Sequence, residues 1–128
     1  MPRTIGPKTE QVLLHGTTLS RAQAIVASQQ LSPHDPLYVV FESNKDLAEV
    51  FARRKAGREG GRPAVVRIVV DDADFQSLRK RSEAKLVPFD AGDDPYLRSR
   101  NQWVISPGGV QFLNHRLLSI DSQMLPTD

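Results

Sequence analysis

The sequence predicts a single α+β domain, and three observations support that class. Patterns of helical periodicity lie early in the chain, with the clearest amphipathic stretches around Ala22–Val26 and Leu47–Phe51. Runs of β-branched residues occur throughout, and Ala64–Val70 is the clearest strand. Strands outnumber helices toward the end of the chain. This order favours α+β over the regular strand–helix alternation of a parallel α/β fold.

The first strand is expected at Gln11–Leu14, where apolar residues follow a proline-containing start. His15–Thr18 comes next, and its glycine is typical of a sharp turn or a close backbone approach. Ser20 and Gln23 have the spacing of a capping box, which predicts the start of a helix. That helix should end before Ser32–Pro33, because the residue before a proline disfavours helical geometry.

A buried strand is expected at Leu37–Phe41, which is rich in β-branched and aromatic residues. Ser43 is the expected N-cap of a second helix, which runs to about Lys55 with a basic outer face. Gly57–Pro63 should form a loop that leads into the strand Ala64–Val70. The remaining expected elements are a short helix capped by Asp72 or Asp74 and reaching Leu78, an acidic loop at Ser82–Tyr96, a strand at Trp103–Ile105, a turn at Pro107–Gly109, and a closing strand at Leu117–Ile120.

The domain should span residues 11–121, with tails at 1–10 and 122–128. A chain of 128 residues can bury a core without metal or disulfide support. It contains no cysteine, which excludes a disulfide framework, a thiolate nucleophile and a cysteine-based metal site. The longest apolar run, Leu37–Phe41, is far shorter than the ~20 residues of a membrane span. Met1–Lys8 has no apolar signal core, so we expect a cytoplasmic protein without a membrane partner.

Basic residues gather in two groups, within Arg53–Arg62 and Arg79–Lys85. Acidic residues cluster separately, around Asp71–Asp74 and Asp90–Asp94. Such segregation allows a phosphate-bearing partner, but solvated loops and helix faces show the same pattern.

Three motifs combine chemistry-bearing residues with expected strand ends. They are His15–Thr17 before the first helix, Leu37–Val40 before the helix Leu47–Ala52, and Asn101–Ile105. Together they resemble the His-Tyr-Glu class of the ADP-ribosyltransferase superfamily, the branch of diphtheria toxin and the poly-ADP-ribose polymerases. The resemblance covers roughly Val12–Ile120 and rests on short motifs.

The resemblance implies a split β-sheet with flanking helices and a central NAD cleft. NAD would be the substrate, without a metal, and a protein or nucleic-acid acceptor would receive ADP-ribose. A transferase of toxin type would also have a cognate inhibitor as a partner. The reaction passes through an oxocarbenium-like state on the ribose, so it needs a shaped pocket and nearby negative potential.

The same resemblance implies a role for each matched residue. His15 would hydrogen-bond a ribose hydroxyl, and the backbone of Gly16 would meet the nicotinamide carboxamide. Tyr38 would stack on the nicotinamide ring, while Thr17 and Phe51 would complete the NAD-binding set. These residues would bind and orient NAD without transferring a proton.

The third motif departs from the family pattern, because Gln102, or Trp103 in the neighbouring register, stands where a glutamate is expected. A glutamine can hydrogen-bond the ribose but lacks the charge that favours the oxocarbenium ion. Losing one such group costs about 3–4 kcal/mol of transition-state stabilisation. Asp93 or Asp94, Glu42, or a strong nucleophile would have to compensate.

Structural interpretations compete with these roles. His15 could be a turn histidine, Tyr38 could pack in the core, and Trp103 is expected to anchor the core or a cleft wall. His34 and His115 lack partners at metal-ligand spacing and are expected at the surface, so no metal site is predicted.

Two alternative functions remain open. One is a catalytically inactive module that binds NAD, ADP-ribose or a partner, and Gln102 is its main support. The other is a small RNA-binding or RNA-cleaving domain that uses the histidines and the Arg53–Arg62 stretch. The few aromatic residues argue against a stacking platform for single strands.

Overall fold

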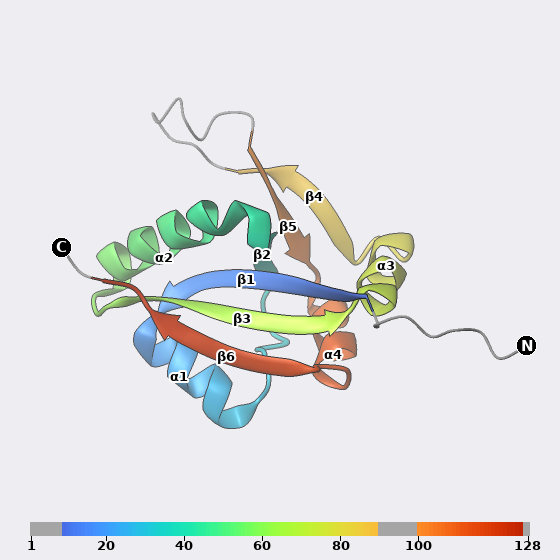
Figure 1. Ribbon diagram of the computed structural model, residues 1–128, viewed down its shortest axis with the longest axis horizontal. Coiled ribbons are helices and arrows are strands. Elements are labelled where there is room, and N and C mark those ends of the chain that lie inside the picture. The colour runs from blue at the N-terminus through green and yellow to red at the C-terminus, as the bar shows by residue number, and fades with distance from the viewer. Residues whose placement is uncertain (1–8, 90–99, 127–128) are drawn as a thin grey trace, which may run out of the picture.

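The computed structural model describes residues 9–89 and 100–126 (Figure 1). Strands and helices mix along the chain, which confirms the α+β class. In chain order the elements are β1 (Glu10–Thr18), α1 (Leu19–Ser28), β2 (Leu37–Phe41), a 3₁₀ turn η1 (Glu42–Asn44), α2 (Lys45–Glu59), β3 (Pro63–Asp71), α3 (Asp72–Lys80), β4 (Ala84–Pro88), β5 (Asn101–Ile105), α4 (Pro107–Asn114) and β6 (Ser119–Met124).

The strands form one antiparallel sheet in the order β4-β5-β2-β1-β3-β6. Pairing between β1 and β3 is extensive and runs from Glu10↔Asp71 to Thr18↔Pro63. Pairing between β1 and β2 contains only Leu13↔Phe41 and Leu14↔Val40. The sheet is therefore nearly divided between β1 and β2, and from His15 onward β1 is paired only with β3.

Helices cover both faces of the sheet (Figure 1). On one face, Leu47, Ala48 and Ala52 of α2 pack against Leu14 and neighbouring strand residues. On the other face, apolar residues of α1, α3 and α4 form a larger core with Leu13, alternate residues of β3 and Ile105 of β5. Since successive strand residues point to opposite faces, His15 belongs to the face of α1 and Gly16 to the face of α2.

The first half of the chain differs from expectation in its boundaries. The His15–Thr18 segment lies within β1 and is not a turn after it. Thr18, not Ser20, is the N-cap of α1, and its hydroxyl accepts a hydrogen bond from the Arg21 amide at 3.4 Å. Ser43 lies within η1 and does not cap α2, which begins after Asn44. The second helix continues past Lys55 to Glu59, because it packs along β1 and β3.

The second half contains two elements that the sequence did not indicate. Residues 84–88 form β4, although they were expected within the acidic loop Ser82–Tyr96. Pro107–Asn114 forms α4 where a turn was expected, because Ser106 accepts a hydrogen bond from the Gly109 amide and Pro107 occupies the first turn. The third helix begins after Asp71 instead of being capped by Asp72 or Asp74. Its extent through Leu78 agrees with expectation.

The strands pass both expected ends of the domain. The first strand begins at Glu10, and the closing strand runs to Met124 rather than stopping at Ile120. The rest of the expected tails, residues 1–8 and 127–128, lies outside the described part of the chain. Among the helices of residues 9–89 and 100–126, none has the length and apolar character needed to cross a membrane.

Candidate functional site

His15 lies where β1 separates from β2, and it connects the two strands through its side chain. The residue is 8% exposed, and its Nδ1 atom is 2.8 Å from the carbonyl oxygen of Tyr38. A carbonyl oxygen can only accept, so Nδ1 carries the hydrogen and donates it. In the neutral ring, Nε2 is then left with a lone pair that can accept a hydrogen bond.

The electrostatic surroundings keep this imidazole neutral. Burial lowers the pKa of His15 from 6.5 to about 4, and the positive charges of Lys55 and Arg21 act in the same direction. The hydrogen bond to the Tyr38 carbonyl opposes this shift but is outweighed. At neutral pH, His15 is therefore a hydrogen-bond acceptor at Nε2 and has no proton to give as a general acid.

Tyr38, Phe51 and Gln102 line one small pocket on the α2 side of the sheet, together with Gly16. The Tyr38 and Phe51 rings are nearly parallel, at 24°, with centroids 6.3 Å apart. Phe51 also lies 6.5 Å from the His15 ring, so the aromatic pair is continuous with the histidine. Tyr38 is 38% exposed and is not a core residue, which removes the packing interpretation of this tyrosine.

This pocket is almost filled by its own side chains, with a free volume of about 10 Å³. A third ring held between two parallel rings needs about 7 Å between them, since stacked carbon atoms approach to about 3.5 Å. The volume of the pocket leaves no room for such a ring, so the Tyr38 and Phe51 rings would have to separate to admit one. Because Tyr38 is at the surface, its ring can move without opening the core.

Gly16 has a packing role that its residue type explains. A Cβ atom at this position would meet the Ala48 carbonyl oxygen and would lie 2.7 Å from the Ala52 amide nitrogen. Glycine therefore lets α2 lie directly against β1, and this contact brings Phe51 toward Tyr38. On its other side, Gly16 pairs with Val65 of β3.

A larger cavity of about 270 Å³ lies on the opposite face of β1, beneath α1. His15 and Thr17 form part of its wall, with Arg21 from α1 and Lys55 from α2. Asp35, in the loop before β2, contributes a carboxylate. The Thr17 residue is 1% exposed, and its hydroxyl oxygen has no hydrogen-bond partner among the described residues.

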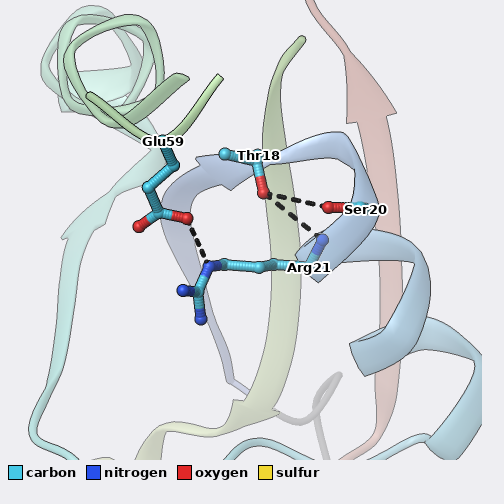
Figure 2. A network of polar contacts seen from close by, with 4 residues as sticks. All are labelled: Thr18, Ser20, Arg21 and Glu59. Atoms are coloured by element: carbon cyan, nitrogen blue, oxygen red, sulfur yellow. Dashed lines mark hydrogen bonds and ion pairs between the residues drawn. The ribbon is translucent and has the colours of Figure 1, made fainter. Parts of the chain in front are cut away.

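Arg21 is held at this cavity through its backbone amide and through its side chain (Figure 2). Its amide nitrogen donates to the Thr18 hydroxyl, and that hydroxyl lies 3.5 Å from the Ser20 hydroxyl. Its Nε atom donates to Glu59 Oε1 at 2.7 Å, which joins the start of α1 to the end of α2. This contact lowers the pKa of the Glu59 carboxyl through the hydrogen bond from Arg21.

Lys55 was expected on a basic outer helix face, but it is half-buried at the cavity. Burial lowers the pKa of its ammonium group, and the neighbouring Arg21 guanidinium adds to the shift. Within residues 9–89 and 100–126, Lys55 forms no ion pair. The Glu59 and Asp35 carboxylates oppose this shift in the Lys55 pKa, so charges of both signs lie at the cavity.

Several expected residues do not join the site. Glu42 faces Arg67 at 3.5 Å and lines a separate cavity with Lys45, so it is not beside Gln102. Asp93 and Asp94 lie outside the described residues. Within the basic Arg53–Arg62 stretch, the Arg53 side chain donates to the Pro126 carbonyl and the Arg54 guanidinium lies over the Phe89 ring. Two cations of that stretch thus have partners in the fold.

Sequence reasoning missed Arg21, Asp35 and Lys55. Arg21 follows the His15–Thr17 motif by one helical turn, and that spacing could have placed it near the motif. Asp35 stands between two prolines in an irregular loop, and nothing local indicates where it points. Lys55 was grouped with its neighbours by charge, although on a helix it lies one turn after Phe51 and on the same face.

Among the described residues, no group of His, Asp or Glu side chains could hold a metal ion. The geometry instead places two cavities on the two faces of β1. His15 lines the polar one, and its ring lies 6.5 Å from the Phe51 ring, which lines the aromatic one. Comparisons with family models, with curated proteins and with solved structures each found no match to this chain.

Proposed function

We propose that this protein is an NAD-binding domain of ADP-ribosyltransferase type, with the dinucleotide lying across β1 at His15. The observation that carries the proposal is the fixed His15 side chain in the gap between β1 and β2. Its Nδ1–H bond to the Tyr38 carbonyl leaves Nε2 as an acceptor for a ribose hydroxyl.

One of the two cavities near His15 is aromatic and the other is polar and cationic. These properties match the nicotinamide ring and the phosphates of NAD, respectively. The Tyr38 and Phe51 rings offer aromatic surface for nicotinamide. Arg21 and Lys55 offer positive charge for the phosphates, and Asp35 and the Thr17 hydroxyl offer polar atoms for a sugar. The 270 Å³ cavity is at the small end of the range for ligand pockets, so it suits one part of a dinucleotide better than the whole.

The proposed reaction breaks the bond between the ribose and the nicotinamide nitrogen, and the electron pair leaves with nicotinamide. The acceptor nucleophile forms the new bond to the ribose carbon and releases its proton. Gln102, in the pocket of Tyr38 and Phe51, can hold a ribose hydroxyl through its amide. It supplies no negative charge, so we propose that this protein binds NAD well and turns it over slowly.

The experiment is a calorimetric titration of the chain with NAD⁺ at neutral pH. We expect one saturable site in the micromolar to millimolar range, which corresponds to about 4–8 kcal/mol. His15→Ala should abolish the heat, whereas the control His115→Ala should not, because His115 is an exposed residue at the end of α4. Tyr38→Ala provides a second test at a surface position, with thermal unfolding as the check that each variant folds.

If His15→Ala and Tyr38→Ala both bind NAD⁺ as well as the parent chain, the site assignment is wrong. If no variant and no parent protein binds NAD⁺, the function is wrong. Binding without nicotinamide release, even at long incubation, identifies the inactive NAD-binding form of the same domain.

A further inference from the structure

A separate groove lies between α3 and the edge strand β4. Both elements lie away from α1 and from the outer end of α2 (Figure 1). The groove has a volume of about 740 Å³ and is lined by Gln76, Arg79 and Lys80 of α3, Lys85 and Leu86 of β4, and Trp103 of β5. Leu86 is 54% exposed, and it lies directly across from Trp103 in the β4–β5 register. The groove therefore has an apolar floor and a basic wall.

The charged residues that line this groove are all positive. Arg79, Lys80 and Lys85 contribute three cations, and none of the lining residues is acidic. No ion pair involves these three cations in the part of the chain that the structure describes. Arg79 is held by the Trp103 ring, whose centroid is 5.1 Å from the guanidinium carbon, and by its bond to Gln76 Oε1. Its charge is thus fixed at the groove.

The outer edge of β4 offers backbone hydrogen bonds. The Ser106 amide donates to the Glu83 carbonyl, and the Phe89 amide donates to the Arg100 carbonyl, both at 2.8 Å. In an antiparallel ladder, hydrogen-bonded residues alternate, so the odd-numbered residues of β4 face β5. The N–H and C=O groups of Ala84 and Leu86 then face outward, without a backbone partner among the described residues.

We propose that this edge and groove bind an acidic, extended segment of a partner protein, which adds as a strand beside β4. Backbone groups of Ala84 and Leu86 would pair with the added strand. Apolar side chains of the segment would rest on Leu86. Its carboxylates, which alternate with them, would lie nearest Lys85, and Arg79 and Lys80 would add positive potential at the groove. The site is distinct from the NAD cleft and does not depend on it.

The observations favour this occupant over two others. A second copy of this chain, pairing edge to edge, would bring two sets of the same cations together, and edge lysines oppose such pairing. Nucleic acid would satisfy the cations but would make no use of the open backbone N–H and C=O groups at the edge of β4. An acidic strand uses the charge, the apolar floor and the edge at once.

The test uses a fluorescein-labelled peptide of alternating glutamate and valine, seven residues long, followed by fluorescence anisotropy. The comparison probes are a peptide of alternating lysine and valine and a labelled single-stranded DNA of about 20 nucleotides. We expect the chain to bind the acidic peptide, to bind more weakly as salt rises, and not to bind the lysine peptide.

Two pairs of variants locate the binding. Lys80→Glu with Lys85→Glu should weaken acidic-peptide binding at least tenfold, while the control Arg58→Glu with Arg62→Glu changes the charge equally at exposed positions elsewhere. Leu86→Pro removes an outward N–H without touching the β4–β5 ladder, and proline is tolerated on such an edge. It should weaken binding more than Leu86→Ala, which keeps the N–H and removes only the apolar side chain.

The proposal is overturned if the acidic peptide does not bind or if it binds both charge-reversed proteins equally. It is also overturned if Leu86→Pro binds as well as Leu86→Ala, because edge pairing would then play no part. DNA binding that is lost in Lys80→Glu with Lys85→Glu but kept in Leu86→Pro would assign the groove to nucleic acid instead. None of these results depends on NAD binding.

Discussion

His15 is a buried polar side chain that connects two strands and keeps one ring nitrogen available as a hydrogen-bond acceptor. Its bond to the Tyr38 carbonyl connects β1 to β2 just beyond the last register pair, Leu14↔Val40. The same bond fixes the tautomer and leaves Nε2 as an acceptor. A histidine with a pKa of about 4 makes a steady acceptor, because its ring stays neutral across the physiological range.

This pKa predicts how stability depends on pH. The folded pKa of His15 lies below the unfolded value of 6.5, so protons bind the unfolded chain more tightly. The contribution is fully present above pH 6.5 and is lost as the pH falls toward 4. Over that range it amounts to roughly 3 kcal/mol. Urea unfolding at pH 7 and pH 5 should therefore show a larger loss of stability in the parent chain than in His15→Gln.

Comparing the parent chain with His15→Gln isolates the contribution of His15 to the pH dependence, because the carboxylates titrate in both proteins. If His15→Gln loses stability between pH 7 and pH 5 as steeply as the parent, the imidazole is not neutral in the folded state. His115→Gln is the matched control and should retain the parent's slope, since this exposed residue shares no contact with the Tyr38 carbonyl.

Gln102 carries the second prediction at the residue scale. Gln102→Glu places a carboxylate in the pocket of Tyr38 and Phe51 at almost constant volume. If Gln102 holds the ribose, this change should raise the rate of nicotinamide release by a factor of at least about 100, the effect of one well-placed charge on such a transition state. The measurement is nicotinamide release from NAD⁺ by chromatography. An unchanged rate, with NAD⁺ still bound, would place the reacting bond away from Gln102.

At the scale of elements, the contact between β1 and α2 determines the shape of the cleft. Gly16→Ala would push a methyl group into the backbone of α2 at Ala48 and Ala52. We expect it to destabilise the fold by about 3 kcal/mol, at the upper end for overpacking, because backbone cannot rotate away. Gly57→Ala is the control, since a Cβ there meets no atom within 4 Å.

Gly57 lies inside α2, so its replacement by alanine should stabilise the chain by about 0.5–1 kcal/mol. Urea unfolding of both variants should show a lower free energy of unfolding for Gly16→Ala and a higher one for Gly57→Ala. Equal effects of the two substitutions would mean that α2 does not depend on close contact at Gly16.

The elements also show what local sequence can and cannot predict. The strand Pro63–Asp71 and the helix around Leu47–Phe51 were predicted, because each has a strong apolar pattern of its own. The strand Ala84–Pro88 was missed, since its lysine and proline resemble a loop and its order comes from pairing with β5. The helix Pro107–Asn114 was missed because proline and two glycines suggest a turn unless the Ser106 cap is recognised.

At the scale of the whole molecule, strand order brings the distant motifs together. Because β2 lies between β1 and β5, Gly16, Tyr38 and Gln102 line one pocket. Phe51 of α2 lines the same pocket. The family resemblance predicted one cleft that also included His15 and Thr17, but these two residues line the cavity beneath α1 instead. No local pattern specifies the order of strands, since it follows from long-range pairing. The cavity with Arg21, Asp35 and Lys55 was invisible for the same reason.

The molecule also separates two surfaces of different chemistry. The residues around His15 include two aromatic rings and two cations, and we propose that they bind NAD. The groove at β4 combines cations with an open strand edge, and it fits an acidic polypeptide. In Figure 1, β4 lies beyond β5, on the far side of that strand from β1, and α3 follows the end of β3.

The most direct test of the central claim is an NMR titration of the ¹⁵N-labelled chain with NAD⁺. The amide signals of His15, Gly16 and Tyr38 should shift and saturate together. The indole signal of Trp103, the single tryptophan, reports on the β4 groove and should stay in place. Saturating shifts confined to the gap between β1 and β2 are the result that this account predicts. A titration that leaves those three amides unmoved, up to millimolar NAD⁺, would contradict it.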